Sequence, residues 1–249
     1  MRRRVKIGLA GLTGLVGLAQ TYRWLRVVTS VQRHERHWVR RQLRPGELRY
    51  VALGDSLAQG IGASAPERGY VGLLAARLER ATGLGVAVVN LSATGVLIDD
   101  VINYQLPALL GIDPPPDLVT VTAGTNDAGR RDHAGIGERF DALCARLPAG
   151  TLVADLPRFH HGRRRAAARE AAAAVRDVLG RHPHLVPVRL DEATARSGLG
   201  LRSAELFHPN DLGHRHYADL FWSALRQRWP AVPVSPAPPA VVSQPGRTG

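Results

Sequence analysis

Short apolar runs alternate with amphipathic segments through most of the chain. Continuous apolar runs of this length are typical of strands that are buried on both faces of a parallel sheet. Five of them occur, at Tyr50–Leu53, Val86–Asn90, Leu118–Thr122, Thr151–Asp155 and Leu185–Leu190. Segments with helical periodicity lie between and after them, at about 70–81, 96–110, 136–147, 163–179 and 211–228. The alternation predicts a three-layer α/β/α sandwich with a five-stranded parallel sheet.

Two prolines refine this pattern. Pro187 falls inside the fifth apolar run. Because proline cannot donate a hydrogen bond to a neighbouring strand, that strand is predicted to lie at an edge of the sheet. Pro107 falls inside the helical pattern of residues 96–110, and it predicts that this helix is interrupted there.

The first apolar run leads directly into Gly54-Asp55-Ser56-Leu57. Glycine permits a sharp turn, and a serine between a strand and a helix is expected to point its hydroxyl outward. The free N–H groups at the start of the helix can stabilise an anion above that hydroxyl. The arrangement therefore suggests a hydrolase nucleophile at Ser56. The alternative is a plain turn, because glycine, aspartate and serine favour turns through local hydrogen bonds; in either case Asp55 is expected to support the turn.

A serine nucleophile needs a base, a group that orients the base, and donors for an oxyanion. The chain offers candidates where strands or loops are expected to end. Gly95 follows the second apolar run, Asn126 follows the third, and Glu205 stands three residues before His208. In open α/β sheets, ligands bind at the edge where the parallel strands end, so these residues are expected to gather there.

The motifs resemble the four sequence blocks of the GDSL esterases and lipases, also called the SGNH hydrolase superfamily. The matching positions are Gly54–Leu57, Gly95, Gly124–Asp127 and His208-Pro209, in the family's order and over roughly residues 48–229. The resemblance implies a flavodoxin-like fold, with no cofactor and no catalytic metal.

Carried over by position, the resemblance assigns a role to each site residue. It implies Ser56 as nucleophile, His208 as general base, and an oxyanion hole formed by the Ser56 and Gly95 N–H groups with the Asn126 amide. The sequence departs from the family at one position, since the family usually has aspartate where this chain has Glu205. Glutamate keeps the charge and adds a rotatable bond, so we expect it still to orient His208.

Other reactive residues suggest no second site. The pairs His182/His184 and His214/His216 are each two residues apart, which does not place them on one helix face, and no carboxylate cluster accompanies them. No metal site is therefore predicted. The lone Cys144 cannot form a disulfide within one chain, and its amphipathic surroundings predict a buried core thiol.

The net charge of +12 is concentrated near the N-terminus. Residues 1–49 carry 12 Lys or Arg and only two acidic residues, whereas the rest of the chain carries 21 basic and 19 acidic residues. The expected catalytic domain is therefore close to neutral. No zinc finger, RNA-recognition signature or basic zipper is present in the sequence, so no nucleic-acid partner is predicted.

Composition divides the chain into four parts. Residues 1–22 have a basic start and an apolar run at positions 7–19, which is typical of a signal peptide or a signal-anchor. Residues 23–47 form a basic juxtamembrane helix or linker. Residues 48–229 form the hydrolase domain. Residues 230–249 contain six prolines and are predicted to be a disordered tail.

The basic segment permits two interpretations. It could lie on an anionic membrane surface, with Trp24, Leu25, Val28 and Trp38 as apolar anchors, or it could pack on its own domain. The membrane interpretation favours a secreted protein or one anchored at the cell envelope.

The sequence thus predicts a monomeric serine esterase or lipase with a Ser-His-Glu triad and an acyl-enzyme intermediate, acting on a small-molecule or lipid ester. Two alternatives stay open. One is a membrane-tethered binding protein whose site is impaired by Glu205. The other is an acyltransferase that passes the acyl group to an alcohol instead of water.

Overall fold

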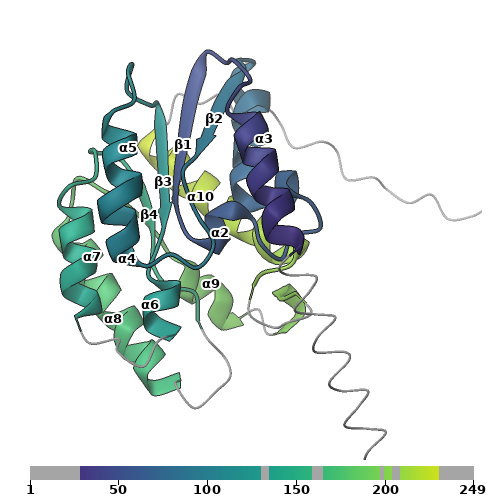
Figure 1. The fold of residues 1–249 in the computed structure, drawn as a ribbon. Coiled ribbons are helices and arrows are strands. Elements are labelled where there is room, and N and C mark those ends of the chain that lie inside the picture. The colour runs from purple at the N-terminus through teal and green to yellow at the C-terminus, as the bar shows by residue number, and fades with distance from the viewer. Residues whose placement is uncertain (1–28, 130–134, 159–164, 197–198, 204–207, 230–249) are drawn as a thin grey trace, which may run out of the picture.

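The protein has a central five-stranded sheet with helices on both sides (Figure 1). The computed structural model describes residues 29–129, 135–158, 165–196, 199–203 and 208–229. The strand order is β2-β1-β3-β4-β5, and every neighbouring pair is parallel. The strands are β1 (Leu48–Gly54), β2 (Val86–Asn90), β3 (Leu118–Thr122), β4 (Leu152–Ala154) and β5 (Val186–Val188). The predicted fold class is confirmed, and β5 lies at an edge as Pro187 indicated.

Helices connect the strands and cover both faces. A helix of residues 29–41 precedes β1. The α-helices that follow are α2 (Ser56–Gln59), α3 (Tyr70–Thr82), α4 (Ile98–Asp100), α5 (Leu106–Leu110), α6 (Thr125–Gly129), α7 (Ile136–Cys144), α8 (Arg165–Arg181), α9 (Leu190–Arg196) and α10 (Asp211–Arg228). Short 3₁₀ helices occur at Pro66–Arg68 and Leu199–Leu201, and Val101–Gln105 forms a π-helical turn.

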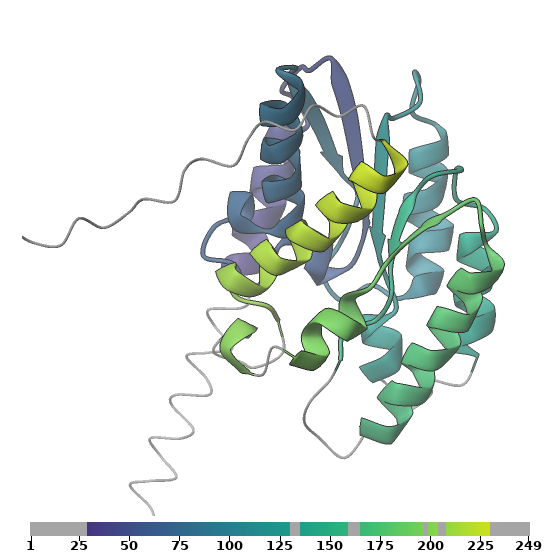
Figure 2. The same ribbon diagram turned by 180° about the vertical axis from the view of Figure 1, so that it is seen from behind.

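Alternate residues of β1 point into two separate cores, as the period of a strand requires. Tyr50 and Ala52 belong to the core shared with α3 and α10, whereas Val51 and Leu53 belong to the core shared with α5, α7 and α8. Figure 2 shows α10 crossing the sheet on the side opposite α5 and α7. The sheet is thus buried on both faces, which explains the continuous apolar runs.

The prediction that Pro107 interrupts its helix was wrong, and the last helix begins at a cap that the sequence pattern did not identify. The helix does not stop at Pro107, because proline lies in the first turn of α5 and a π turn precedes it. There the Leu106 N–H donates to the Val101 carbonyl. The last helix is capped by the Asn210 side chain, which accepts from the Gly213 N–H at 3.0 Å. Asp211 instead accepts from the Ser64 N–H at 2.7 Å.

The helix of residues 29–41 packs on its own domain. Trp38 is buried, and its indole N–H donates to the Gln59 carbonyl at 3.0 Å. Of the two interpretations of the basic segment, packing on its own domain is therefore the one that holds for Trp38. The other three proposed anchors lie outside the described residues, as do the segments 1–22 and 230–249. No helix in the described part of the chain is long and apolar enough to span a bilayer.

Candidate active site

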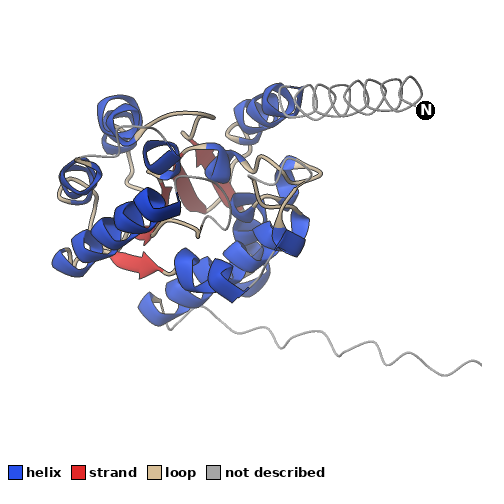
Figure 3. Cartoon of the chain, turned by 90° about the horizontal axis from the view of Figure 1, so that it is seen from below, coloured by secondary structure: helices blue, strands red, loops and turns tan. Residues whose placement is uncertain are grey.

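The turn after β1 requires glycine. Gly54 has a φ of +129°, and a Cβ placed there would lie 1.9 Å from the Thr122 carbonyl oxygen of β3. The next N–H, that of Asp55, donates to this same oxygen at 3.1 Å. Ser56 is then the first residue of α2. The predicted strand-turn-helix arrangement is present at the carboxyl edge of the sheet, which Figure 3 views from below.

Asp55 supports this turn. Its Oδ1 accepts a hydrogen bond from the Leu57 N–H at 2.9 Å and so caps α2. Burial raises the pKa of the Asp55 carboxyl to about 6, although the Leu57 N–H and the nearby His208 partly oppose that rise. The structural role expected for Asp55 is the one observed.

Ser56 and His208 meet across 152 positions of sequence. His208 Nε2 lies 3.1 Å from Ser56 Oγ, which is hydrogen-bonding distance. Ser56 is only 3% exposed and His208 9% exposed, so the expected outward-facing hydroxyl is instead directed at an imidazole within a largely buried site. One cause is the close packing of the loop after α2, because a Cβ at Gly62 would lie 2.2 Å from the Pro209 carbonyl.

The candidate oxyanion residues lie on two loops that hold each other. Asn126 follows β3 in α6, and its Nδ2 donates to the Val96 carbonyl at 2.8 Å. Its neighbour Asp127 accepts from the Ile98 N–H at 3.2 Å. Gly95 has a φ of +85°, and the space that a Cβ would occupy there is open. The structure therefore brings Asn126 and the Gly95 loop together, while Glu205 lies outside the described residues.

The family is decided by the sequence around this site. Residues 52–216 match the GDSL-like Lipase/Acylhydrolase family. The match covers more than half of the 249 residues and includes Ser56, Gly95, Asn126 and His208. The chain belongs to this family. It is thus a carboxylic ester hydrolase of the GDSL type.

Solved structures share the fold of this GDSL hydrolase. A lipase/acylhydrolase from Enterococcus faecalis is 24% identical with a TM-score of 0.60, over 73% of this chain and 96% of that one. An extracellular lipase from Streptomyces rimosus is 24% identical with a TM-score of 0.55, over 71% and 99%. An acetyl xylan esterase from Geobacillus stearothermophilus is 18% identical with a TM-score of 0.55, over 77% and 98%. A search of curated proteins found no match.

Several polar residues that hold the hydrolase site were not predicted. Asn90 ends β2, and its amide donates to the Ala58 carbonyl at 2.8 Å. Its oxygen accepts from the Ser92 N–H at 3.1 Å, and the Gln59 amide donates to the Ser92 carbonyl. Ser92 therefore holds its loop, whereas the buried Thr94 hydroxyl has no partner in the described structure. A polar residue closing an apolar run was the available signal for Asn90.

The remaining candidates have structural roles. Cys144 is buried, as predicted, and burial raises the pKa of its thiol to about 12. His182 Nε2 lies 3.0 Å from Asp141, and His184 Nε2 lies 3.2 Å from the Cys144 carbonyl. Within the described ranges, no group of three or more His, Cys, Asp or Glu residues is placed to hold a metal.

His214 is a fully buried neutral imidazole behind the site. Its Nδ1 accepts from the Tyr70 N–H at 3.3 Å, which leaves Nε2 to donate to the Ile61 carbonyl at 3.1 Å. Burial lowers the pKa of His214 to about 4, although the Ile61 carbonyl partly opposes that shift. Both ring nitrogens are occupied, so His214 cannot ligate a metal without losing one of these bonds.

The pKa of His214 predicts a pH-dependent stability. An unfolded chain binds the proton near pH 6.5 and the folded protein only near pH 4, so stability is lost as the pH falls through this range. We expect the unfolding free energy of the wild type relative to His214→Gln to fall by roughly 3 kcal/mol between pH 7 and pH 4. Urea denaturation across this range measures it. His216→Gln, two residues further along α10, is the control. The prediction would be contradicted if the unfolding free energy changed equally with pH in wild type and in His214→Gln.

Proposed function

We propose that this GDSL hydrolase is a serine esterase that works through an acyl-enzyme. The contact of 3.1 Å between Ser56 Oγ and His208 Nε2 carries the proposal. His208 takes the hydroxyl proton as Ser56 attacks the ester carbonyl, and then gives that proton to the departing alcohol. Water attacks the acyl-enzyme by the same route, which releases the carboxylic acid and restores Ser56.

The oxyanion hole is assigned to the Ser56 and Gly95 N–H groups and the Asn126 amide. Ser56 stands at the start of α2, where backbone N–H groups have no helical partner. Asn126 Nδ2 carries two hydrogens and gives one to the Val96 carbonyl, so the second can serve the oxyanion. The open space beside Gly95 leaves room for a substrate carbonyl.

Glu205 is assigned as the residue that orients His208. Glu205 lies within residues 204–207, outside the described residues. The residues that flank this segment are hydrogen-bonded, because the Ser203 N–H donates to the His208 carbonyl at 2.9 Å. In the sequence, Glu205 stands three residues before His208. A carboxylate bonded to Nδ1–H would fix the tautomer in which Nε2 accepts the Ser56 proton.

Labelling with a fluorophosphonate tests the proposal. The reagent modifies an activated serine, and peptide mass spectrometry locates the adduct. We expect the adduct on Ser56. We also expect the unlabelled protein to hydrolyse p-nitrophenyl esters. An adduct on another serine, or turnover that survives complete labelling, would overturn the assignment. The ester chain length that gives the highest kcat/KM would then distinguish short acyl groups from lipid-like substrates.

We further propose that residues 1–22 direct the protein to the cell envelope, as a signal peptide or a signal-anchor. The basic start and the apolar run at positions 7–19 support this location. Cell fractionation of the full chain and of a version without residues 1–22 tests it. Equal amounts of both proteins in the cytosolic fraction would argue against an envelope location.

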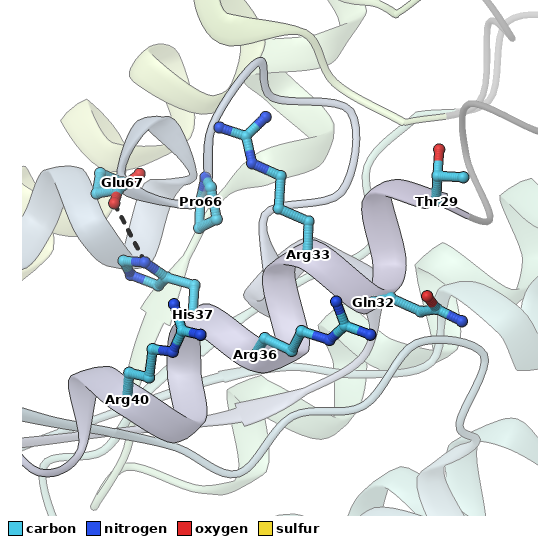
Figure 4. A pocket seen from close by; sticks show the side chains of 8 residues that line it. All are labelled: Thr29, Gln32, Arg33, Arg36, His37, Arg40, Pro66 and Glu67. Carbon is cyan, nitrogen blue, oxygen red and sulfur yellow. Dashed lines mark ion pairs between the residues drawn. The ribbon is translucent and has the colours of Figure 1, made fainter.

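Exposed arginines next to this segment suggest contact with an anionic membrane surface. Arg36 and Arg40 are exposed on the helix of residues 29–41 and, with Arg33, line a pocket of about 370 Å³ beside Pro66 (Figure 4). In the same pocket, His37 Nδ1 lies 3.1 Å from Glu67 Oε1. Because Trp38 fixes the inner face of this helix, its outer face presents the arginines in a set orientation.

Vesicle binding measures the contribution of these arginines. Each basic side chain near an anionic surface contributes about 1 kcal/mol, so Arg36→Gln/Arg40→Gln should weaken binding to phosphatidylglycerol vesicles roughly 30-fold. Binding to phosphatidylcholine vesicles should not change. The control is Arg146→Gln/Arg226→Gln, which removes the same charge from exposed positions away from this helix. Equal losses in both double variants would mean that only net charge matters.

A further inference from the structure

The side chain of Gln105 binds both polar groups of Gly54. Its Oε1 accepts from the Gly54 N–H at 2.7 Å, and its Nε2 donates to the Gly54 carbonyl at 2.9 Å. Gln105 is 6% exposed, and 51 positions of sequence separate the two residues. Neither the sequence motifs nor the family resemblance singles out Gln105, yet it contacts the residue two positions before Ser56.

The helix that carries Gln105 is locally altered. Val101–Gln105 forms a π turn between α4 and α5, and the Leu106 N–H reaches the Val101 carbonyl, five residues earlier. A π turn adds a residue to the helix and so changes which side chains face the sheet; such turns are frequent at functional sites. Here Gln105 is buried against β1 while Tyr104 is 73% exposed.

The two bonds satisfy Gly54 where the pairing of β1 with β2 has ended, while pairing with β3 continues through Gly54 and Thr122. The ladder between β1 and β2 stops at Ala52 and Asn90, before Gly54. The Gly54 carbonyl also accepts from the Ala93 N–H at 3.1 Å, while its N–H is bound by Gln105. Buried backbone groups without partners cost free energy, so an amide side chain that donates and accepts at once suits this position.

We infer that Gln105 is a positioning residue for the nucleophile. The amide fixes the position of the Gly54 peptide groups. Only Asp55 separates Gly54 from Ser56, so the same bonds help to fix the position of the Ser56 hydroxyl and N–H. The inference rests on the proposed role of Ser56 as nucleophile and oxyanion donor. Small displacements of such groups are costly in rate: a shift of about 1 Å can cost on the order of 100-fold. Gln105 acts through Gly54.

Two substitutions test the inference on the full chain with p-nitrophenyl acetate as substrate. Gln105→Met removes both hydrogen bonds, and we expect kcat to fall on the order of 10- to 100-fold with KM little changed. Gln105→Glu keeps the shape. A protonated carboxyl can donate to the Gly54 carbonyl and accept from its N–H, whereas an ionised one cannot donate. The kcat of Gln105→Glu relative to wild type should therefore rise as the pH is lowered from 8 to 6.

Dividing the kcat of each variant by the wild-type kcat at the same pH removes any titration that both proteins share. The ratio for Gln105→Met should stay flat over the same pH range. Thr151→Val is a structural control, because Thr151 is buried and donates to the Pro148 carbonyl at 2.7 Å, just before β4 and at the opposite end of the sheet. It should lower the melting temperature while leaving kcat unchanged.

Each outcome separates the inference from the proposed function. If the Gln105 variants lose stability but keep kcat, or if the Gln105→Glu ratio does not depend on pH, Gln105 has only a structural role. Should Gln105→Met fail to fold, the pH dependence of the isosteric Gln105→Glu still decides. If the fluorophosphonate adduct is not on Ser56, the proposed function is wrong. If Ser56 is labelled at the wild-type rate in both Gln105 variants, the inference about Gln105 is wrong and the proposed function is unaffected.

Discussion

Ser56→Ala is expected to lower kcat for ester hydrolysis by a factor on the order of 10⁴ or more. In the proposed mechanism, alanine removes the attacking oxygen and leaves His208 with no proton to accept from the enzyme. Because the Ser56 N–H remains, substrate affinity should change little. Steady-state kinetics with p-nitrophenyl esters measure kcat and KM separately, and fluorophosphonate labelling should be lost as well.

Ser92→Ala is the matched control for this experiment. Ser92 is a buried serine at the same edge of the sheet, and its hydroxyl hydrogen-bonds the Asn90 side chain. Its loss should lower stability and leave labelling of Ser56 intact. Turnover within tenfold of wild type in Ser56→Ala, in protein freed of contaminating esterases, would remove Ser56 from the mechanism.

Asn126→Ala should lower kcat by about 10²–10³, the range found when one oxyanion donor is removed from an acyl-transfer enzyme. In its proposed role the amide stabilises charge that develops only in the transition state, so KM should stay close to the wild-type value. Asn126→Asp should be similarly impaired, because its carboxylate cannot donate. Steady-state kinetics at saturating substrate measure the loss.

The bond from Asn126 to the Val96 carbonyl calls for a control with a similar structural loss. Asn90→Ala removes another side-chain amide near the site, the one that holds Ala58 and Ser92. We expect it to lower the melting temperature with a smaller effect on kcat than Asn126→Ala. Equal kcat losses in the two variants would mean that Asn126 acts through loop structure and not as an oxyanion donor.

Features set by local pattern could be predicted from the sequence. All five strands were found, because burial on both faces makes their apolar runs continuous. The contact between Ser56 and His208 was anticipated from motif order, although the two are far apart in the chain. The strands were predicted from local pattern, whereas the contact was implied by the resemblance to the GDSL family.

Features that depend on distant partners could not be predicted in this way. Whether Trp38 faces lipid or protein is decided by the Gln59 carbonyl, which the sequence does not place beside it. Asp211 is a good capping residue, but Ser64 and Arg68 engage it and Asn210 caps the helix. In the sequence, Gln105 is one polar residue of a helical segment, and its contact with Gly54 depends on the fold. In each case a tertiary contact overrides the local preference.

The packing of Trp38 has a practical consequence for shortening the protein. Its indole joins the pre-strand helix to the carbonyl of Gln59, the last residue of the short helix that begins with Ser56. A truncation starting at residue 48 would delete Trp38 and also His34, both buried. Removing a buried tryptophan costs on the order of 3–5 kcal/mol, a large part of a typical domain's stability. Trimming intended to improve solubility should therefore stop before residue 29, so that Ser56 keeps the support behind its helix.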